Sequence, residues 1–406
     1  MWIVCQIGAR EHYAIPRALQ QTGTLEVLLT DFWVAPGHGF AKLPGAQRLR
    51  DRYHPELAGA KWYAPNLRML GFELEQRLMK RSGWPVMIAR NRIFQRQAIF
   101  FLRKYDFGLI EVPTLFSYCY SARELFLFAK QRGWNTVLGQ IDPGPQEERI
   151  VAEEHRRYSK AASSWQPVPQ EYWRQWREEL ELADRVIVNS EWSRECLLKE
   201  GVPVGKIEIV PLVYQNGRAG PPGPPTCRQR REEAPESSGG CRLRVLFLGQ
   251  IILRKGIGRL LDAMRMLKHD PIELTLAGPS EIDPSAWADL PNVHWVGSVP
   301  RSEVGRLYHE ADVFILPTLS DGYAITQLEA LSRGLPVIAS SHCGEAVVHG
   351  KTGWILPDLE PETIRDLLLE VRHSLHSLKA VTAPEFGLDD LARALLGKEK
   401  SGSGGR

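Results

Sequence analysis

The sequence predicts an α/β protein made of two Rossmann-like domains that face each other across a cleft. Short apolar runs of strand length alternate with amphipathic stretches of helical length in both halves of the chain. This alternation is typical of parallel, doubly wound sheets. Residues 216–240, rich in Pro, Gly, Ser and charge, are expected to be a flexible linker or insertion between the halves. A length of 406 residues also favours two domains over one.

The first half of the chain, residues 1–215, is expected to form the N-terminal domain. Its apolar runs are short, rich in Val, Ile and Leu, and bounded by polar or turn-forming residues, as buried strands are. The expected strands are residues 2–8, 25–31, 107–112, 135–140, 185–190 and 206–210, and the expected helices between them include residues 9–23, 116–131 and 191–200.

The second half, residues 241–380, repeats this scheme in a smaller domain. Its expected strands are residues 243–249, 272–278, 292–297, 312–317 and 336–340, and its expected helices include residues 257–268, whose apolar side chains share one face, and residues 361–375. Residues 381–406 are expected to form a C-terminal helix and a disordered tail. Ligands of such sheets bind beyond the carboxyl ends of the strands, which here face the cleft between the domains.

Composition narrows the class of protein. A net charge of +3 is too small for a polycation that binds nucleic acid generally, so nucleic acid is an unlikely partner. The six cysteines are scattered without a Cys-x-x-Cys pair, which argues against a zinc site and suits a reducing compartment such as the cytoplasm. The first residues lack the basic lead and long apolar run of a signal peptide, and no segment is apolar enough to span a membrane.

One loop of the second half is suited to bind phosphate. Arg254 and Lys255 lie between the strand that ends at Gly249 and the helix that follows Gly256. The N-terminus of a helix attracts anions, and two cations beside it would hold a diphosphate through charge-assisted hydrogen bonds. A solvated basic turn is the alternative interpretation.

A second loop carries two carboxylates, Asp321 and Glu329, separated by seven residues. Asp321 stands where a helix N-cap is expected, and capping alone would explain it. Gly322 follows it, and glycine permits the close approach of a ligand to the backbone. Glu329 lies beside the apolar stripe of the expected helix, where it would either bind vicinal hydroxyls such as those of ribose or be an ordinary paired or solvated side chain.

These stretches together carry a family resemblance. LPTLSDGYAITQLEALSRGLPVIAS (316–340), FLGQIILRKG (247–256) and CGEAVVHGKTGWILP (343–357) resemble the motifs of family 4 of the retaining glycosyltransferases, which have the GT-B architecture. Residues 183–214 resemble the segment that closes the N-terminal domain in that family, and residues 7–19 resemble its opening loop and helix. The resemblance implies transfer of a hexose from a nucleoside-diphosphate sugar to a glycan or lipid-linked acceptor with retention of configuration. It implies no cofactor, and the lack of an Asp-x-Asp motif predicts no essential metal.

The resemblance also implies roles at the matching positions. Glu329 would hold the ribose hydroxyls of the donor, Asp321 would face its hexose, and Lys255 would bind its diphosphate. The resemblance thus places catalytic roles at Asp321, Glu329 and Lys255, donor contacts at Arg254, Gly249, Gly322, Tyr323, Ala324 and Glu329, and acceptor-side or cleft positions at Gly8 and His12.

The sequence departs from the family pattern at three positions. Asp321 stands where Glu is usual, Ala324 where Gly is common, and Gln250 where Arg is usual. The departures leave the donor open and support one alternative, a non-catalytic protein that binds nucleotide sugars. A second alternative is a GT-B-like sugar-nucleotide epimerase, which fits less well because the context of the two acids resembles that of transferases.

Two further segments bear on the acceptor. Residues 61–104 hold ten Lys or Arg and two Glu, a net charge of +8, with aromatic residues between them. They form either helices packed on the sheet with a solvated basic face or a surface for anionic lipid, so the protein is expected in the cytoplasm, either free or on the inner face of the membrane. Residues 140–155, with Asp142, Glu147 and Glu148, either line the acceptor cleft or cap a helix.

Overall fold

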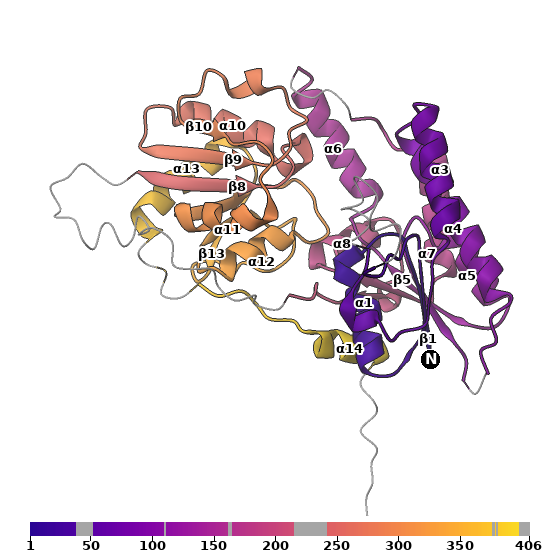
Figure 1. Cartoon of the computed structure of the whole chain (residues 1–406). Coiled ribbons are helices and arrows are strands. Elements are labelled where there is room, and N and C mark those ends of the chain that lie inside the picture. Colours follow the sequence, from indigo (N-terminus) through magenta and orange to yellow (C-terminus); the bar gives the residue numbers. More distant parts are fainter. Residues whose placement is uncertain are drawn as a thin grey trace, which may run out of the picture.

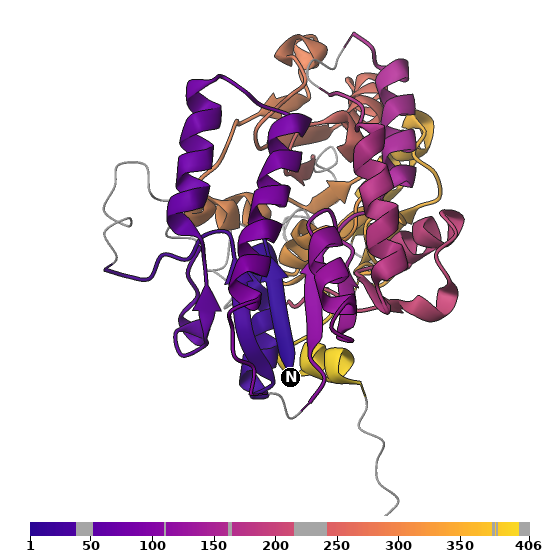
Figure 2. The same ribbon diagram turned by 90° about the vertical axis from the view of Figure 1, so that its right-hand side faces the viewer.

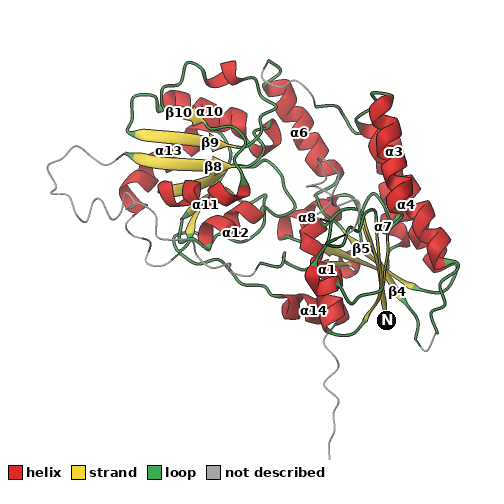
Figure 3. Cartoon of the chain, viewed as in Figure 1, coloured by secondary structure: helices red, strands yellow, loops and turns green. Residues whose placement is uncertain are grey.

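The structure is a computed structural model that describes residues 1–37, 52–108, 111–160, 165–214, 242–375, 378 and 381–397. The linker expected at residues 216–240 and the tail expected after the last helix lie outside these residues. The described chain forms two α/β units, each a parallel sheet with helices packed on its faces (Figures 1 and 3). The fold class predicted from the sequence is therefore confirmed.

The N-terminal sheet has seven strands in the order β3-β2-β1-β4-β5-β6-β7. Its strands are β1 (Trp2–Gln6), β2 (Leu25–Thr30), β3 (Trp62–Tyr63), β4 (Thr114–Tyr118), β5 (Asn135–Gly139), β6 (Arg185–Val188) and β7 (Ile207–Ile209). The helices of this domain are α1 (Ala14–Gln21), α3 (Asn66–Leu78), α4 (Trp84–Leu102), α5 (Arg123–Lys130), α6 (Pro145–Arg157), α7 (Gln170–Leu182) and α8 (Glu191–Lys199). Every pair of neighbouring strands is parallel.

The C-terminal sheet has six parallel strands in the order β10-β9-β8-β11-β12-β13. Its strands are β8 (Leu243–Leu248), β9 (Ile272–Ala277), β10 (Val293–Trp295), β11 (Val313–Leu316), β12 (Val337–Ser340) and β13 (Gly353–Leu356). Its helices are α10 (Ile257–Met266), α11 (Arg301–Glu310), α12 (Ile325–Leu331) and α13 (Pro361–Ser374). Most of the elements expected from the apolar runs are present, with ends shifted by a few residues.

One expected strand is wrong. Residues 107–108 and 111–112 are not strand, and β4 instead extends over residues 116–118, which were expected to begin a helix that starts only at Arg123. β4 pairs with β1 in the middle of the sheet, with Trp2 opposite Thr114 and Cys5 opposite Ser117. Pairing with a central strand decides which of two neighbouring apolar runs becomes strand, and local propensity does not report it.

The last helix, α14 (Leu388–Leu396), packs on the N-terminal domain although it follows the C-terminal sheet (Figure 2). Leu391 and Leu395 are buried in the same apolar cluster as Leu19 of α1. Arg185 of β6 donates a hydrogen bond to the carbonyl oxygen of Leu395 at 2.9 Å. This bond gives a partner to one of the carbonyl groups that have none at the C-terminal end of a helix. The chain therefore crosses between the domains twice.

Both sheets contain a point where the strand order reverses, between β1 and β4 and between β8 and β11. Crevices beyond the carboxyl ends of strands at such switch points are the usual ligand sites of open α/β sheets. The two loops singled out in the sequence follow β8 and β11, so they flank the switch point of the C-terminal sheet.

Candidate active site between the domains

The two loops of the C-terminal switch point are held tightly together. Gly256 has φ 73°, and a Cβ at this position would overlap the carbonyl oxygen of Pro317, so no other residue fits without movement. The carbonyl oxygen of Arg254 accepts hydrogen bonds from the N–H of Leu319 at 2.9 Å and from the hydroxyl of Thr318 at 3.2 Å. The loop after β8 and the loop after β11 therefore behave as one unit.

This unit carries a compact charged cluster of Arg254, Lys255 and Asp321. The ammonium of Lys255 pairs with Asp321, and the guanidinium of Arg254 lies 3.5 Å from the same carboxylate. Arg254 also donates to the carbonyl oxygen of Ser320 at 3.0 Å. Burial by itself would raise the pKa of Asp321, but the two cations outweigh it and hold that pKa below its usual value. Asp321 is thus an ionised carboxylate that pairs with both cations, and its single negative charge balances only one of their two positive charges.

The expectation that Asp321 caps a helix is wrong. Helix α12 begins at Ile325, and its N-cap is Ala324, whose side chain accepts no hydrogen bond. The N–H of Asp321 instead donates to the carbonyl oxygen of His342 at 2.9 Å, so the carboxylate points to the cations and not to the helix.

The residues after Asp321 contact both domains. A Cβ at Gly322 would overlap the carbonyl oxygen of Ile141 in the N-terminal domain, so contact between the domains already requires glycine here. The ring of Tyr323 lies over Gly344, and the N–H of Ala324 donates to the carbonyl oxygen of Cys343 at 3.0 Å.

Glu329 and Gly249 have contacts with residues outside the charged cluster. The hydroxyl of Tyr308 donates to Glu329 Oε2 at 3.0 Å, and among the described residues no hydrogen bond or ion pair joins Glu329 to Lys255, Arg254 or Asp321. Gly249, with φ 151°, packs against Gly278 at the end of the neighbouring strand.

The two acceptor-side positions also have structural partners. Gly8 has φ 85°, and its N–H donates to Asp31 at 2.8 Å beside the Asp31–Arg52 ion pair. His12 is exposed and lies in a short 3₁₀ segment (Arg10–Tyr13) with positive φ angles at Glu11 and His12. His12 does not line the pocket described next.

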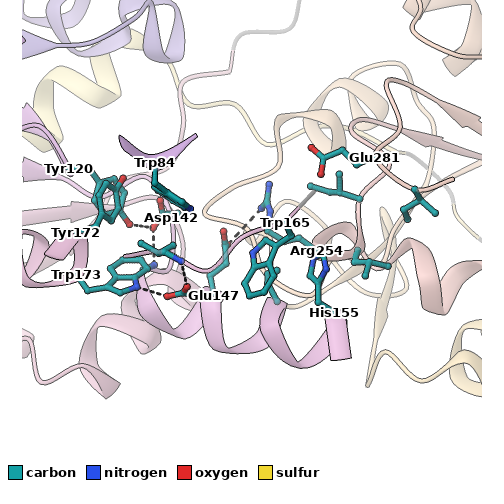
Figure 4. A pocket seen from close by; sticks show the side chains of 17 residues that line it. Trp84, Tyr120, Asp142, Glu147, His155, Trp165, Tyr172, Trp173, Arg254 and Glu281 are labelled. Atoms are coloured by element: carbon teal, nitrogen blue, oxygen red, sulfur yellow. Dashed lines mark hydrogen bonds and ion pairs between the residues drawn. The ribbon is translucent and has the colours of Figure 1, made fainter. Parts of the chain in front are cut away.

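A pocket of about 250 Å³ lies between the domains beside the charged cluster (Figure 4). Arg254 lines it from the C-terminal domain, and residues of α4, α6 and α7 line it from the N-terminal domain. The segment 140–155 contributes Asp142, Glu147 and Glu148 to the lining of this pocket, and its role toward an acceptor stays a prediction.

The three carboxyl groups of this segment differ in their partners. Asp142 accepts hydrogen bonds from the hydroxyl of Tyr120 at 2.6 Å and from the N–H of Gly144 at 2.8 Å. Glu148 accepts from the indole N–H of Trp173. Glu147 faces Arg254 at 3.7 Å, and burial raises its pKa to about 8 in spite of that cation. A carboxyl in this state carries a proton at neutral pH.

The aromatic wall of the pocket was missed in the sequence. It consists of Trp84, Tyr120, Trp165, Tyr172 and Trp173 (Figure 4). The density of aromatic residues in SSWQPVPQEYWRQW (163–176) was a signal for it, although helix packing explains such a stretch equally well.

Among the residues that the structure describes, no group of three or more His, Cys, Asp or Glu side chains is placed to hold a metal ion. Within the same residues, no helix has the length and apolar character needed to cross a membrane.

The fold and this site define a protein of the GT-B architecture with a cationic loop at the switch point of its second domain. Solved structures of this architecture superimpose on nearly the whole chain. One is HepE of Anabaena in complex with UDP and glucose, with a TM-score of 0.56 and 12% identity over 97% of this chain and 94% of that chain. Another is sucrose-phosphate synthase of Thermosynechococcus elongatus, with a TM-score of 0.58 and 17% identity over 98% of this chain and 94% of that chain.

Sequence comparison relates the C-terminal domain to a family. Residues 242–373 match the model of the family described as glycosyl transferases group 1. The amylovoran biosynthesis glycosyltransferase AmsK of Erwinia amylovora is 32% identical over 145 residues, which cover 32% of this chain and 36% of that protein. The putative colanic acid biosynthesis glycosyltransferase WcaL of Salmonella typhimurium is 27% identical over 149 residues, again 36% of its length. The match thus spans about a third of these relatives.

Proposed function

We propose that the protein is a retaining glycosyltransferase of family 4 that moves a hexose from a nucleoside-diphosphate sugar to a glycan or lipid-linked acceptor. The observation that carries the proposal is the pair of cations, Arg254 and Lys255, held at the switch point of the domain that matches group 1 glycosyltransferases. UDP in the HepE structure supports a nucleotide ligand for this fold.

The cations are suited to stabilise the leaving group. Departure of the diphosphate develops negative charge, and Lys255 and Arg254 would stabilise it without a metal or cofactor. Asp321 pairs with both cations in this structure, so the donor diphosphate would take over part of these ion pairs. Asp321 is then free to face hydroxyl groups of the hexose, while Glu329 would bind the ribose. The acceptor hydroxyl would attack on the face that the diphosphate leaves, and its proton would pass to the departing phosphate.

Two other functions use the same fold. A sugar-nucleotide epimerase would convert the donor without an acceptor, and a non-catalytic protein would bind it without turnover. Hydrolysis or transfer of the sugar by the purified protein excludes the non-catalytic function, and an isomerised sugar nucleotide as the product identifies the epimerase.

The test is a thermal-shift series with UDP, GDP, ADP and CMP and their common sugars on the wild type, Lys255→Ala, Glu329→Ala and the control Lys351→Ala. Lys351 is exposed in the same domain. A ligand at a hundred times its Kd stabilises the folded state by about 2.7 kcal/mol, which is readily seen as a rise in Tm. We expect one nucleoside diphosphate to raise the Tm of the wild type and the control but not of the two site variants. No shift with any nucleotide on folded protein would refute a nucleotide-sugar site.

We also propose that the protein works in the cytoplasm and binds the inner face of the membrane through α3. Leu67, Leu74 and Leu78 recur on one face of this helix and are 75%, 52% and 83% exposed. Lys80 and Arg81 follow at the end of the helix and are exposed as well. An exposed apolar stripe beside basic residues is suited to an anionic lipid surface.

A further inference from the structure

We propose that the pocket between α6, α7 and the loop of Arg254 binds one sugar ring of the acceptor, with Glu147 hydrogen-bonded to a hydroxyl of that ring. This inference rests on the proposed function where it calls the bound sugar an acceptor. The binding of a sugar ring to the pocket can be tested without that function.

The position of the pocket fits an acceptor site. It is lined from both domains, and Arg254 connects it directly to the charged cluster, because the same guanidinium faces Glu147 at 3.7 Å and Asp321 at 3.5 Å. A ring in the pocket would therefore lie next to the loop that we assign to the donor diphosphate. Transfer needs this proximity, since both reactants must be held close together.

The aromatic wall fits the apolar face of a pyranose. Tyr120 and Tyr172 are stacked with ring centroids 4.6 Å apart, and Trp84 meets Tyr172 edge-on at 5.1 Å. Trp165 stacks on His155 at 4.7 Å (Figure 4). Contacts among these rings hold them rigid, so they offer large flat surfaces at little entropic cost.

Glu147 supplies one buried oxygen, Oε2, without a hydrogen-bond partner, although its carboxyl group also has a side-chain hydrogen bond with Ser320. Its Oε2 is buried and accepts no hydrogen bond, and 3.7 Å to Arg254 is too long for one. Leaving a buried carboxyl oxygen unpaired costs free energy that a ligand hydroxyl would recover. Glu148 does not offer this, because its two oxygens accept from the N–H of Val168 and the indole N–H of Trp173. Neither oxygen of Asp142 is a buried atom without a partner, and its Oδ1 already accepts from Tyr120 and Gly144.

The groups that face Glu147 are Arg254, Asp321 and Ser320 from the C-terminal domain and Asp142 and Cys196 from the N-terminal domain. Burial and the two carboxylates raise its pKa to about 8, against the effect of the guanidinium. At neutral pH the protonated carboxyl both donates and accepts, as a hydroxyl of a sugar does.

The size of the pocket limits the ligand to a small ring. Its volume of about 250 Å³ lies just below the roughly 300–1,000 Å³ of sites for drug-sized molecules. One sugar ring fits this combination of a flat apolar wall and a polar end better than a lipid chain, which would leave Glu147 unpaired.

The test is saturation-transfer NMR with the methyl glycosides of glucose, galactose, mannose and rhamnose, with and without UDP. The proteins are the wild type, Trp165→Ala, Glu147→Ala and the control Glu153→Ala, whose side chain lies on the same helix but is exposed. We expect at least one glycoside to bind the wild type and the control saturably, and both pocket variants to bind it about tenfold more weakly. Melting curves establish that each variant is folded.

Two results overturn the inference: no saturable signal from any glycoside, or signals of equal strength in the wild type and in both pocket variants. Binding of UDP, GDP, ADP and CMP is measured on the same samples. If UDP binds and the glycosides do not, only the sugar pocket is refuted. If the glycosides bind and none of UDP, GDP, ADP and CMP does, the pocket stands and the transferase proposal fails.

Discussion

At the scale of single residues, burial decides the chemistry of the site. Asp321 and Glu147 are both carboxyls beside Arg254, yet their pKa values shift in opposite directions. Asp321 has two cations close by and stays ionised, whereas Glu147 shares one cation with other carboxylates and keeps its proton. The same residue type thus supplies a counter-ion in one place and a neutral hydrogen-bonding group in the other.

The raised pKa of Glu147 predicts that the stability of the protein depends on pH. Its pKa is about 8 in the folded protein against a usual 4.5, so the folded state binds this proton more tightly than the unfolded state. The wild type therefore loses stability as the pH rises between these values, and Glu147→Gln does not share this loss. We expect the variant to gain on the order of 2 kcal/mol over the wild type between about pH 5 and pH 8, measured by urea unfolding. Parallel pH profiles for the variant, the wild type and the control Glu153→Gln would contradict the raised pKa.

The environment of Gly256 predicts that a side chain at this position lowers the stability of the protein. Its positive φ and the carbonyl oxygen of Pro317 leave no room for a side chain. Gly256→Ala should lower the free energy of unfolding by more than about 2 kcal/mol and weaken nucleotide binding, because it separates the two loops of the site. Gly305→Ala is the control, since a Cβ there meets open space within α11 and should stabilise the helix by up to about 1 kcal/mol. Equal stability of the two variants would show that the loops are not closely packed.

At the scale of elements, the loops after β8 and β11 bring the charged residues together because the two strands are neighbours in the sheet. Phe314 of β11 lies opposite Leu246 of β8, so both chains leave the sheet at the same edge. Helix α12 then begins only at Ile325, which leaves Asp321 in the loop and free to pair with the cations.

The exposed leucine side chains of α3 predict how a substitution changes lipid binding. Burying a leucine side chain is worth about 1.5–3 kcal/mol, so Leu78→Glu should weaken vesicle binding about tenfold or more. The measurement is co-sedimentation with phosphatidylcholine vesicles that contain about 30 mol% phosphatidylglycerol, an anionic lipid. Val204→Glu, at a position 59% exposed outside this helix, should bind as the wild type does. Vesicle binding that is absent in the wild type, or unchanged in Leu78→Glu, would refute the lipid surface.

At the scale of the whole molecule, α6 of the N-terminal domain packs on the C-terminal domain. Glu154 is buried and accepts hydrogen bonds from Arg259 of α10 at 2.8–3.0 Å. Tyr158 donates to Asp262 of the same helix at 2.7 Å. These contacts, together with the return of α14 to the first domain, fix the width of the cleft in this structure.

Removing Arg259 should therefore loosen the domains. Arg259→Ala leaves the buried carboxylate of Glu154 unpaired, and such a loss costs roughly 3–5 kcal/mol. We expect a lower Tm and a broader or divided unfolding transition by calorimetry. Arg265→Ala, on the same helix with exposed partners, should change stability by less than about 0.5 kcal/mol. Equal effects of the two substitutions would show that the α6–α10 contact does not hold the domains together.

Much of the fold was predictable because its signals are local. Apolar runs such as residues 243–249 and 336–340 are buried on both faces of a parallel sheet, and they stand out against the polar helices around them. β4 was not predictable in this way, because two apolar runs compete for one place beside β1. The loop of Arg254 and Lys255 was found from its motif, whereas the aromatic wall comes from three separate stretches of chain that meet only in space.

By itself, the sequence determined the alternation of strands and helices, the two sheets, and the position of the charged residues in loops at the ends of strands. Periodicity and short motifs act over a few residues, so they can be read without knowing the fold. Only the tertiary structure decided that α14 returns to the first domain, that Gly322 lies against Ile141, and that Glu147 is buried with an unpaired oxygen. These features depend on contacts between segments far apart in the chain, where burial and neighbouring charges set the energy of each group.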